Sequence, residues 1–284
     1  MAKTSEIQAL ITLLGDDDTQ VSDIARERLK QIGPPAAGLL RETVHMDVDG
    51  KTRIEAQQVL AQIQHEDLIG SFYLVGLLED EHIDLEQAAF LLARLGYPDL
   101  DMAPYQQELQ KLTDRVGRRI KDLHPHRDKT RIVRVINQVL FEEEGFSGNV
   151  EDYYDPDNSF LNRVLERRTG IPITLSVIYL LIARRLHLPI RGINMPVHFI
   201  CQYHSPPDSF YFDPFNAGRT LTRYDCMALL HRAKHPFHEN FLQPARPRDI
   251  IARMMRNLIF VYHHRDDHAK LELLNRICAV LDPS

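Results

Sequence analysis

The sequence predicts a mainly helical α+β protein with helical repeats first, a core with a small antiparallel sheet next, and a helical hairpin last. Three observations predict this order. An apolar triplet recurs through the first hundred residues, the run from Ile173 to Ile182 is apolar nearly all round, and short segments rich in β-branched and aromatic residues follow Pro189. We place the domain boundaries at 1–102, 103–245 and 246–284.

The N-terminal repeat is a triplet at i, i+4 and i+7, with offsets of 31 and 32 residues between copies. Its members are Ala25, Leu29 and Ile32, then Ala56, Leu60 and Ile63, then Ala88, Leu92 and Leu95. This spacing places each triplet on one helix face, and Gly-Pro pairs after the face end the helices. The segment resembles HEAT-type repeats of three helical hairpins; a generic helical bundle is the alternative.

Four helices are expected before the sheet. The first three span 104–121, 129–143 and 160–168, and Gly170 closes the third. The fourth begins at Pro172. Because the fourth helix is apolar on nearly every side, it should be enclosed by other elements. It therefore forms the centre of the predicted core.

Three strands are expected after this helix, at 190–194, 197–203 and 210–213. Alternate residues of a strand share a face, so His198 and Cys201 should point to opposite sides of the sheet. We therefore do not expect Cys201 to act as a nucleophile for His198.

The C-terminal segment predicts two helices around Arg265, Asp266 and Asp267. Asn257, Leu258, Tyr262 and Pro283 resemble landmarks of one tetratricopeptide repeat. A single hairpin of this kind cannot bury its apolar face alone, so it should pack on the core or on a partner.

Composition indicates a cytoplasmic protein without membrane spans. The N-terminus has no secretory apolar region, and three widely spaced cysteines among 284 residues make a disulfide framework improbable. A net charge of −6 argues against nucleic-acid binding. The basic run from Arg115 to Arg134 is interpreted as the solvated faces of two helices, with a basic patch as the alternative.

The segment from Tyr153 to about Leu230 resembles the SirB-type branch of the transglutaminase-like superfamily. The matching blocks are NSFLNRVLERRTGIPITLS, GINMPVHF and FDPFNAG. The resemblance implies a papain-like core with a cysteine nucleophile at the start of the central helix. It also implies that His198 is the base and Asp213 the residue that orients it.

The implied nucleophile is missing. No cysteine precedes Cys201, and counting back from Leu188-Pro189 puts Pro172 at the nucleophile's position. Thr174 and Ser176 are nearby hydroxyls, but both lie inside the predicted helix, where bonding to a main-chain carbonyl is the simpler role.

The remaining polar candidates each have a structural alternative. Asp213 could pair with His198 in a buried structural contact, or could cap the turn that follows it. Asn158, Ser159 and Asn194 are candidate binding residues of the same cleft, although turn formation alone would account for them.

No metal or cofactor is expected. His231, His235 and His238 near Cys226, and the pair His264 and His268, have no second strong ligand pair that would define a zinc site. No glycine-rich loop is present to hold a phosphate.

We expect a non-catalytic binding or regulatory protein that contacts a protein partner through its helical repeats. The alternative is a non-thiol hydrolase or transferase that acts on an amide-like or ester bond through His198 and Asp213.

Overall fold

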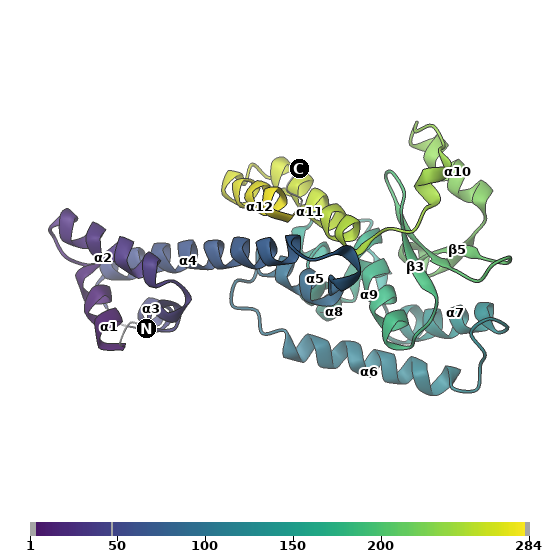
Figure 1. The fold of residues 1–284 in the computed structure, drawn as a ribbon, viewed down its shortest axis with the longest axis horizontal. Coiled ribbons are helices and arrows are strands. Elements are labelled where there is room, and N and C mark those ends of the chain that lie inside the picture. The colour runs from purple at the N-terminus through teal and green to yellow at the C-terminus, as the bar shows by residue number, and fades with distance from the viewer. Residues whose placement is uncertain (1–3, 47, 282–284) are drawn as a thin grey trace. The chain divides into compact units, whose positions relative to one another are not determined.

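A computed structural model describes residues 4–46 and 48–281 (Figure 1). By their contacts these residues divide into two compact units that meet after Gly76. None of the helices in the described ranges combines the length and the hydropathy of a membrane span. Pro283, a landmark of the tetratricopeptide resemblance, lies outside the described residues.

The first unit consists of four helices: α1 (Thr4–Leu13), α2 (Thr19–Ile32), α3 (Pro34–His45) and α4 (Gly50–Gly76). Asp18 caps α2 by accepting a hydrogen bond from the main-chain N–H of Gln20, and Gly33 with φ of 70° separates α2 from α3. The first two predicted triplets lie on α2 and α4, where their alanines are buried. They face one apolar core that all four helices share.

The second unit begins with η1 (Asp80–His82), α5 (Leu85–Ala93), α6 (Ala103–Ile120) and α7 (Lys129–Asn137). The predicted helix over 129–143 is regular only to Asn137; η2 (Gln138–Glu143) continues it as a π-turn. Ala88 and Leu92 of the third triplet are buried on α5, and Leu95, also buried, follows the end of that helix. The triplets therefore lie in two units, and the HEAT-like arrangement stays a prediction.

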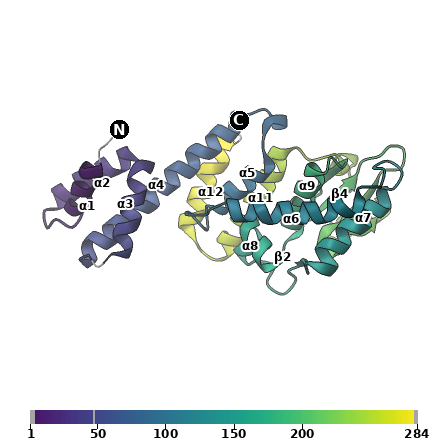
Figure 2. The ribbon, with the colours of Figure 1, turned by 90° about the horizontal axis from the view of Figure 1, so that it is seen from below.

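The centre of the second unit is α9 (Pro172–Arg185), preceded by β1 (Ser147–Gly148), η3 (Pro156–Asn158), α8 (Leu161–Arg167) and β2 (Thr169–Gly170). Every residue of α9 from Pro172 to Ala183 is buried. It contacts β3 (Ile190–Asn194), β4 (Phe199–Tyr203), α6 and α8. Figure 2 shows α6 running along this unit across α9. The predicted enclosed helix is present.

The four-stranded sheet has the order β3-β4-β5-β6, all antiparallel, with β5 (Phe210–Asp213) and β6 (Arg219–Leu221). Strands β3 and β5 have the predicted bounds, and β4 begins two residues later than expected. The 3-10 turn η4 (Pro214–Asn216) joins β5 to β6. A mainly helical α+β fold with a small antiparallel sheet is thus confirmed.

The chain closes with α10 (Arg223–Arg232), η5 (Glu239–Leu242), α11 (Pro247–His264) and α12 (His268–Leu281). The hairpin of α11 and α12 turns around Arg265 to Asp267, as predicted. Helix α11 contacts α9, β3 and η3, so the hairpin packs on the core. One expected detail differs: α8 ends at Arg168 in the left-handed region, with φ of 56°, and Gly170 belongs to β2.

Candidate functional site

The N-terminus of α9 holds a proline where the resemblance implies a thiol. Pro172 is the first helical residue and is buried. Its ring presents no proton, lone pair or charge to the cleft, so it cannot attack a carbonyl. The ring also fixes φ near the helical value and removes an N–H that has no partner in the first turn, which is the ordinary structural use of proline here.

Thr174 caps α9. Its Oγ1 accepts a hydrogen bond from the Ile171 main-chain N–H at 3.1 Å and lies 2.7 Å from the Asn158 carbonyl oxygen, to which it donates. The Ser176 hydroxyl, two residues further along the helix, is buried and has no hydrogen-bond partner among the described residues. Neither hydroxyl is placed as a nucleophile, because Thr174 is fully engaged and Ser176 lies inside the apolar core.

His198 and Asp213 are brought together. Nε2 of His198 lies 2.8 Å from Oδ2 of Asp213. The Asp213 side chain is 3% exposed and that of His198 is 15% exposed. Since Nε2 is engaged by the carboxylate, Nδ1 is the ring nitrogen left for chemistry, and it has no hydrogen-bond partner within residues 4–46 and 48–281. This is the pairing that an orienting acid and a base require.

Asp213 also caps the turn that follows it. It therefore has both roles considered for it from the sequence, the contact with His198 and the cap of this turn. Oδ1 accepts a hydrogen bond from the Phe215 N–H at 3.0 Å, and Oδ2 accepts one from the Asn216 side-chain amide at 2.7 Å. Burial alone would raise the pKa of Asp213. The hydrogen bond and charge of His198, together with the Asn216 and Phe215 donors, outweigh burial and lower this pKa below its usual value.

The residue before His198 has a strained backbone. Val197 has φ of 63°, and the His198 N–H donates to the Pro196 carbonyl at 2.8 Å, which closes a γ-turn of the positive-φ kind. A β-branched residue avoids this region, and the cost is about 1–3 kcal/mol. Such strain occurs often at functional sites, and here it sets the direction from which the imidazole leaves the chain.

One aromatic ring forms a wall beside the imidazole. The Phe215 ring meets His198 edge to face with ring centroids 6.0 Å apart, and meets Tyr153 in the same way at 6.4 Å. Tyr154 in turn stacks on His264 of α11 at 5.8 Å. The loop after β1 is therefore held between the imidazole and α11.

The predicted binding residues have different roles. Asn158 is fully buried and organises the loop, since its side-chain amide donates to the Asp152 carbonyl at 2.7 Å and its Oδ1 accepts from Asn149 at 3.0 Å. Ser159 is also buried, and its hydroxyl has no partner among the described residues. Asn194 lies at the end of β3 and accepts a hydrogen bond from Arg253.

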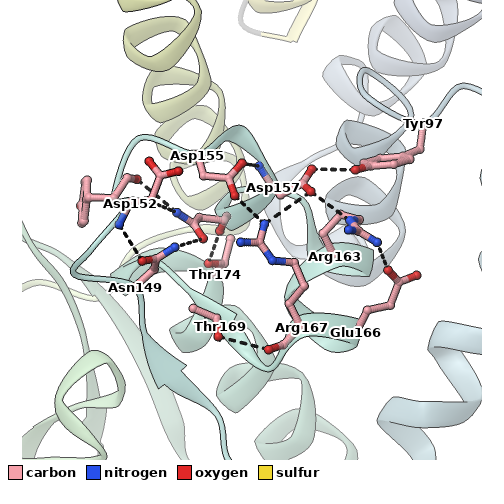
Figure 3. A network of polar contacts seen from close by, with 12 residues as sticks. Tyr97, Asn149, Asp152, Asp155, Asp157, Arg163, Glu166, Arg167, Thr169 and Thr174 are labelled. Carbon is pink, nitrogen blue, oxygen red and sulfur yellow. Dashed lines mark hydrogen bonds and ion pairs between the residues drawn. The ribbon is translucent and has the colours of Figure 1, made fainter.

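A polar network holds the end of the loop after β1, at Asp155 and Asp157, against α8 (Figure 3). Arg163 pairs with Asp157 at 3.1 Å, and Asp157 accepts a hydrogen bond from the Tyr97 hydroxyl at 2.6 Å. Arg167 pairs with Asp155 at 2.6 Å. In Figure 3 these residues point toward one another across the start of α8, so the carboxylates of Asp155 and Asp157 are already paired.

The thiols of the three cysteines are held in their protonated form. Cys201 of β4 is fully buried opposite Phe212 of β5, and burial raises the pKa of its thiol far above the usual range. Burial also raises the pKa of Cys226, to about 11, and that of Cys278. A thiol with a raised pKa is a poor nucleophile, because the thiolate is the reactive form.

No three histidine, cysteine or acidic side chains within the described ranges gather as metal ligands. His264, one of the residues considered for zinc, donates from Nδ1 to the Phe260 carbonyl and stacks on Tyr154. Its role in the structure is to hold the loop.

Sequence reasoning missed Phe215, Tyr153 and Arg253 as residues of this site. Phe215 lies inside the FDPFNAG block, two residues after Asp213, so its position in that turn was an available signal. Arg253 comes from α11, and nothing in its local pattern distinguishes it from other helix-surface arginines.

A helix whose N-terminus faces an antiparallel sheet, with a histidine before one strand and an aspartate at the end of the next, defines a transglutaminase-like core. Comparison with known proteins gives the same answer. The profile of the transglutaminase-like superfamily matches residues 103–256, which is more than half of the chain, and the chain belongs to that superfamily.

Curated relatives extend the similarity beyond the profile. A UPF0162 protein of Xylella fastidiosa is 37% identical over 198 residues, which is 66% of this chain and 68% of the relative. A UPF0162 protein of Vibrio cholerae is 29% identical over 155 residues, covering 54% and 56%. Human F-box only protein 21 is 36% identical over 110 residues, or 36% of this chain and 18% of that protein. No solved structure matches this chain.

Proposed function

We propose that this chain is a cytoplasmic binding or regulatory protein of the SirB-type branch, in which the cleft at His198 and Asp213 binds a ligand without thiol catalysis. One observation carries the proposal. Pro172 stands where the resemblance implies a nucleophile, and Cys201 is buried with a raised thiol pKa. A binding function needs the ordered polar groups around His198 and does not need the missing sulfur.

The helical parts are the proposed partner surfaces. In this proposal the HEAT-like repeats of residues 1–102 contact a protein partner, the core spans 103–245, and the hairpin of 246–284 resembles one tetratricopeptide unit. The apolar faces of α2 and α4 are buried within the first unit. Partner contacts would therefore use outward side chains such as Ile24 and Ile54, which are 69% and 56% exposed.

The second candidate is a non-thiol hydrolase or transferase. It is favoured by the His198 and Asp213 pair itself, since Asp213 engages Nε2 and leaves Nδ1 for a water molecule or a hydroxyl. In this mechanism Nδ1 removes a proton from water as the oxygen attacks an ester or amide carbonyl, and Asp213 stabilises the imidazolium that forms. The proton then passes from Nδ1 to the leaving group.

The two candidates are separated by turnover. The intact chain, the His198→Ala variant and a variant with all three cysteines changed to serine are assayed against p-nitrophenyl esters and fluorogenic peptide amides. The binding proposal expects no turnover above buffer for any of the three. Turnover that survives removal of the cysteines and is lost in a folded His198→Ala protein would establish the hydrolase instead.

Identification of a co-purifying ligand tests the binding proposal directly. The intact chain and a His198→Ala, Asp213→Ala double variant, matched in circular dichroism, are compared for the small molecules that co-purify and can be released by denaturation. The binding proposal expects a ligand on the intact chain that the double variant lacks. Equal ligand content in the two proteins would contradict it.

A further inference from the structure

Arg253 of α11 is a half-buried guanidinium without an acidic partner. Its Nη1 donates to Oδ1 of Asn194 at 3.0 Å and to the Met195 carbonyl at 3.1 Å. No carboxylate within residues 4–46 and 48–281 forms an ion pair with it. A buried charge is ordinarily paired, because transfer from water into a protein costs several kcal/mol per ion.

Four carboxylates of α11, β5 and the segment before α8 are already engaged. Asp249, one helical turn before Arg253, binds Arg246 through both oxygens, at 2.9 and 3.0 Å. Asp213 binds His198 and Asn216. The loop aspartates Asp155 and Asp157 bind Arg167 and Arg163. No ion pair within residues 4–46 and 48–281 thus gives Arg253 a counter-ion.

The environment of Arg253 reflects this lack of a partner. Burial lowers the pKa of the guanidinium, and the like charge of Arg256 lowers it further, while Tyr153 acts in the opposite direction. Arg256 is exposed and forms no ion pair within the described residues. Two unneutralised arginines on one helix produce a local positive potential that favours an anion.

Position connects Arg253 to the imidazole. Asn194 and Met195, which hold Nη1, begin the segment that continues through the γ-turn at Val197 to His198. From the other side, Tyr153 interacts with the charge of Arg253 and also contacts Phe215, whose ring meets His198. Arg253 and His198 are therefore bordered by the same two segments.

The free edge of the guanidinium has a defined chemistry. Both Nη1 protons are directed to Asn194 and Met195, which leaves Nε and Nη2 without partners among the described residues. These two nitrogens form the fork that binds the two oxygens of a carboxylate or a phosphate in parallel. Because Nη1 is tethered, the fork is held in place before the ligand arrives, which reduces the entropy lost on binding.

We propose that Arg253 is the anion-recognition residue of the His198 cleft, and that the ligand of this cleft carries a carboxylate or phosphate group beside the part that reaches the imidazole. This inference rests on the proposed function, since it assigns a ligand class to the same cleft. The anion supplies the counter-charge that the described part of the chain does not give to Arg253.

The test uses the full-length protein with acetate and inorganic phosphate as probes and acetamide as the uncharged control. Nuclear magnetic resonance follows the Arg253 Nε–H signal and the His198 ring signals during each titration. Saturable shifts of both groups with an anion, and none with acetamide, are expected. The anion that gives the tighter binding distinguishes a carboxylate ligand from a phosphate ligand.

Three variants make the test specific. Arg253→Gln removes the charge and the fork while keeping a polar side chain, so anion affinity should fall at least tenfold. Arg253→Lys keeps the charge but loses the fork, so it should give an intermediate affinity. Arg265→Gln removes an equal charge at the C-terminal end of α11 and should bind as the unaltered protein does.

Two outcomes would overturn the inference. One is an anion response that Arg253→Gln leaves unchanged, and the other is a response at Arg253 that never reaches the His198 signals. Failure of the proposed function would look different. Turnover that depends on His198 would replace the binding role while leaving the anion response of Arg253 intact.

Discussion

Gly148 leaves the space that the Phe215 ring fills. A Cβ built on Gly148 would lie 2.5 Å from Cε2 of Phe215, closer than any real Cβ contact. The ring also meets His198 edge to face. The absence of a side chain at position 148 therefore determines where the wall beside the imidazole stands.

Gly148→Ala should displace this wall. The ring must move because the added methyl overlaps three of its carbons, and overpacking of this kind costs about 1–3 kcal/mol. We expect a lower midpoint of denaturant unfolding together with shifted ring signals of His198. Gly117→Ala is the matched control, since there the near atom is a Leu186 methyl at 3.1 Å and a helix interior gains about 0.5–1 kcal/mol from alanine. Equal stability of the two variants would show that Phe215 is not fixed by Gly148.

The strained turn at Val197 is expected to lower the stability of the fold while holding His198 in position for binding. Glycine adopts positive φ at little cost, and the Val197 side chain is 49% exposed, so little packing is lost on its removal. Val197→Gly should therefore be neutral or more stable by about 1 kcal/mol, because relief of strain outweighs the greater freedom of the unfolded chain. Ligand affinity of the cleft should fall at the same time, since His198 is less firmly held.

Val197→Ala provides the comparison for this turn. It removes the β-branch but keeps the steric penalty for positive φ, so its stability should lie below that of Val197→Gly. Thermal unfolding measures the stability, and anion titration measures the binding. A Val197→Gly protein that is less stable than Val197→Ala would show that the turn is not strained.

The Thr174 hydroxyl should matter for stability rather than chemistry. Thr174→Val keeps the shape of the side chain but leaves the Asn158 carbonyl and the Ile171 N–H without their partner. An unsatisfied buried group costs about 1–3 kcal/mol, and we expect a loss in this range by denaturant unfolding. Ser176→Ala is the control and should be neutral or slightly stabilising, because its hydroxyl has no partner to lose. The opposite ranking would contradict the capping role.

The sequence was sufficient for the parts of this fold that local patterns determine. Pro172 indicates the start of α9, and the β-branched and aromatic runs indicate β3 and β5 with their observed bounds. Period-two alternation was applied from position 197, but β4 begins only at Phe199, so the predicted separation of His198 from Cys201 stays a prediction. The π-turn after Asn137 and the two-residue pairing of β1 with β2 were missed, because both depend on tertiary packing and leave no periodic signal.

The site was predicted in part for the same reason. His198 and Asp213 could be paired because each lies in a distinctive block of sequence. Arg253 is separated from His198 by 55 positions and joins the site only through the packing of α11 on β3. No helix pattern predicts that an arginine lacks a counter-ion, since this depends on which carboxylates the fold has already paired.

The last prediction concerns the stability of the fold in acid. The pKa of Asp213 is lowered in the folded protein, so its contribution to stability is fully present above the unfolded-state value of about 3.9 and is lost as the pH falls through the lower folded value. Between these two pKa values the folded state binds fewer protons than the unfolded state. The free energy of unfolding must therefore decrease as the pH decreases through this range. Asp213→Asn should make the acid limb shallower while lowering stability at neutral pH, where the charge opposite His198 is missing. Asp122→Asn, at an exposed carboxylate, should leave both features unchanged. Urea unfolding at a series of pH values from 6 down to 2 measures the two limbs; an unaltered acid limb in Asp213→Asn would mean that other carboxylates carry the acid sensitivity.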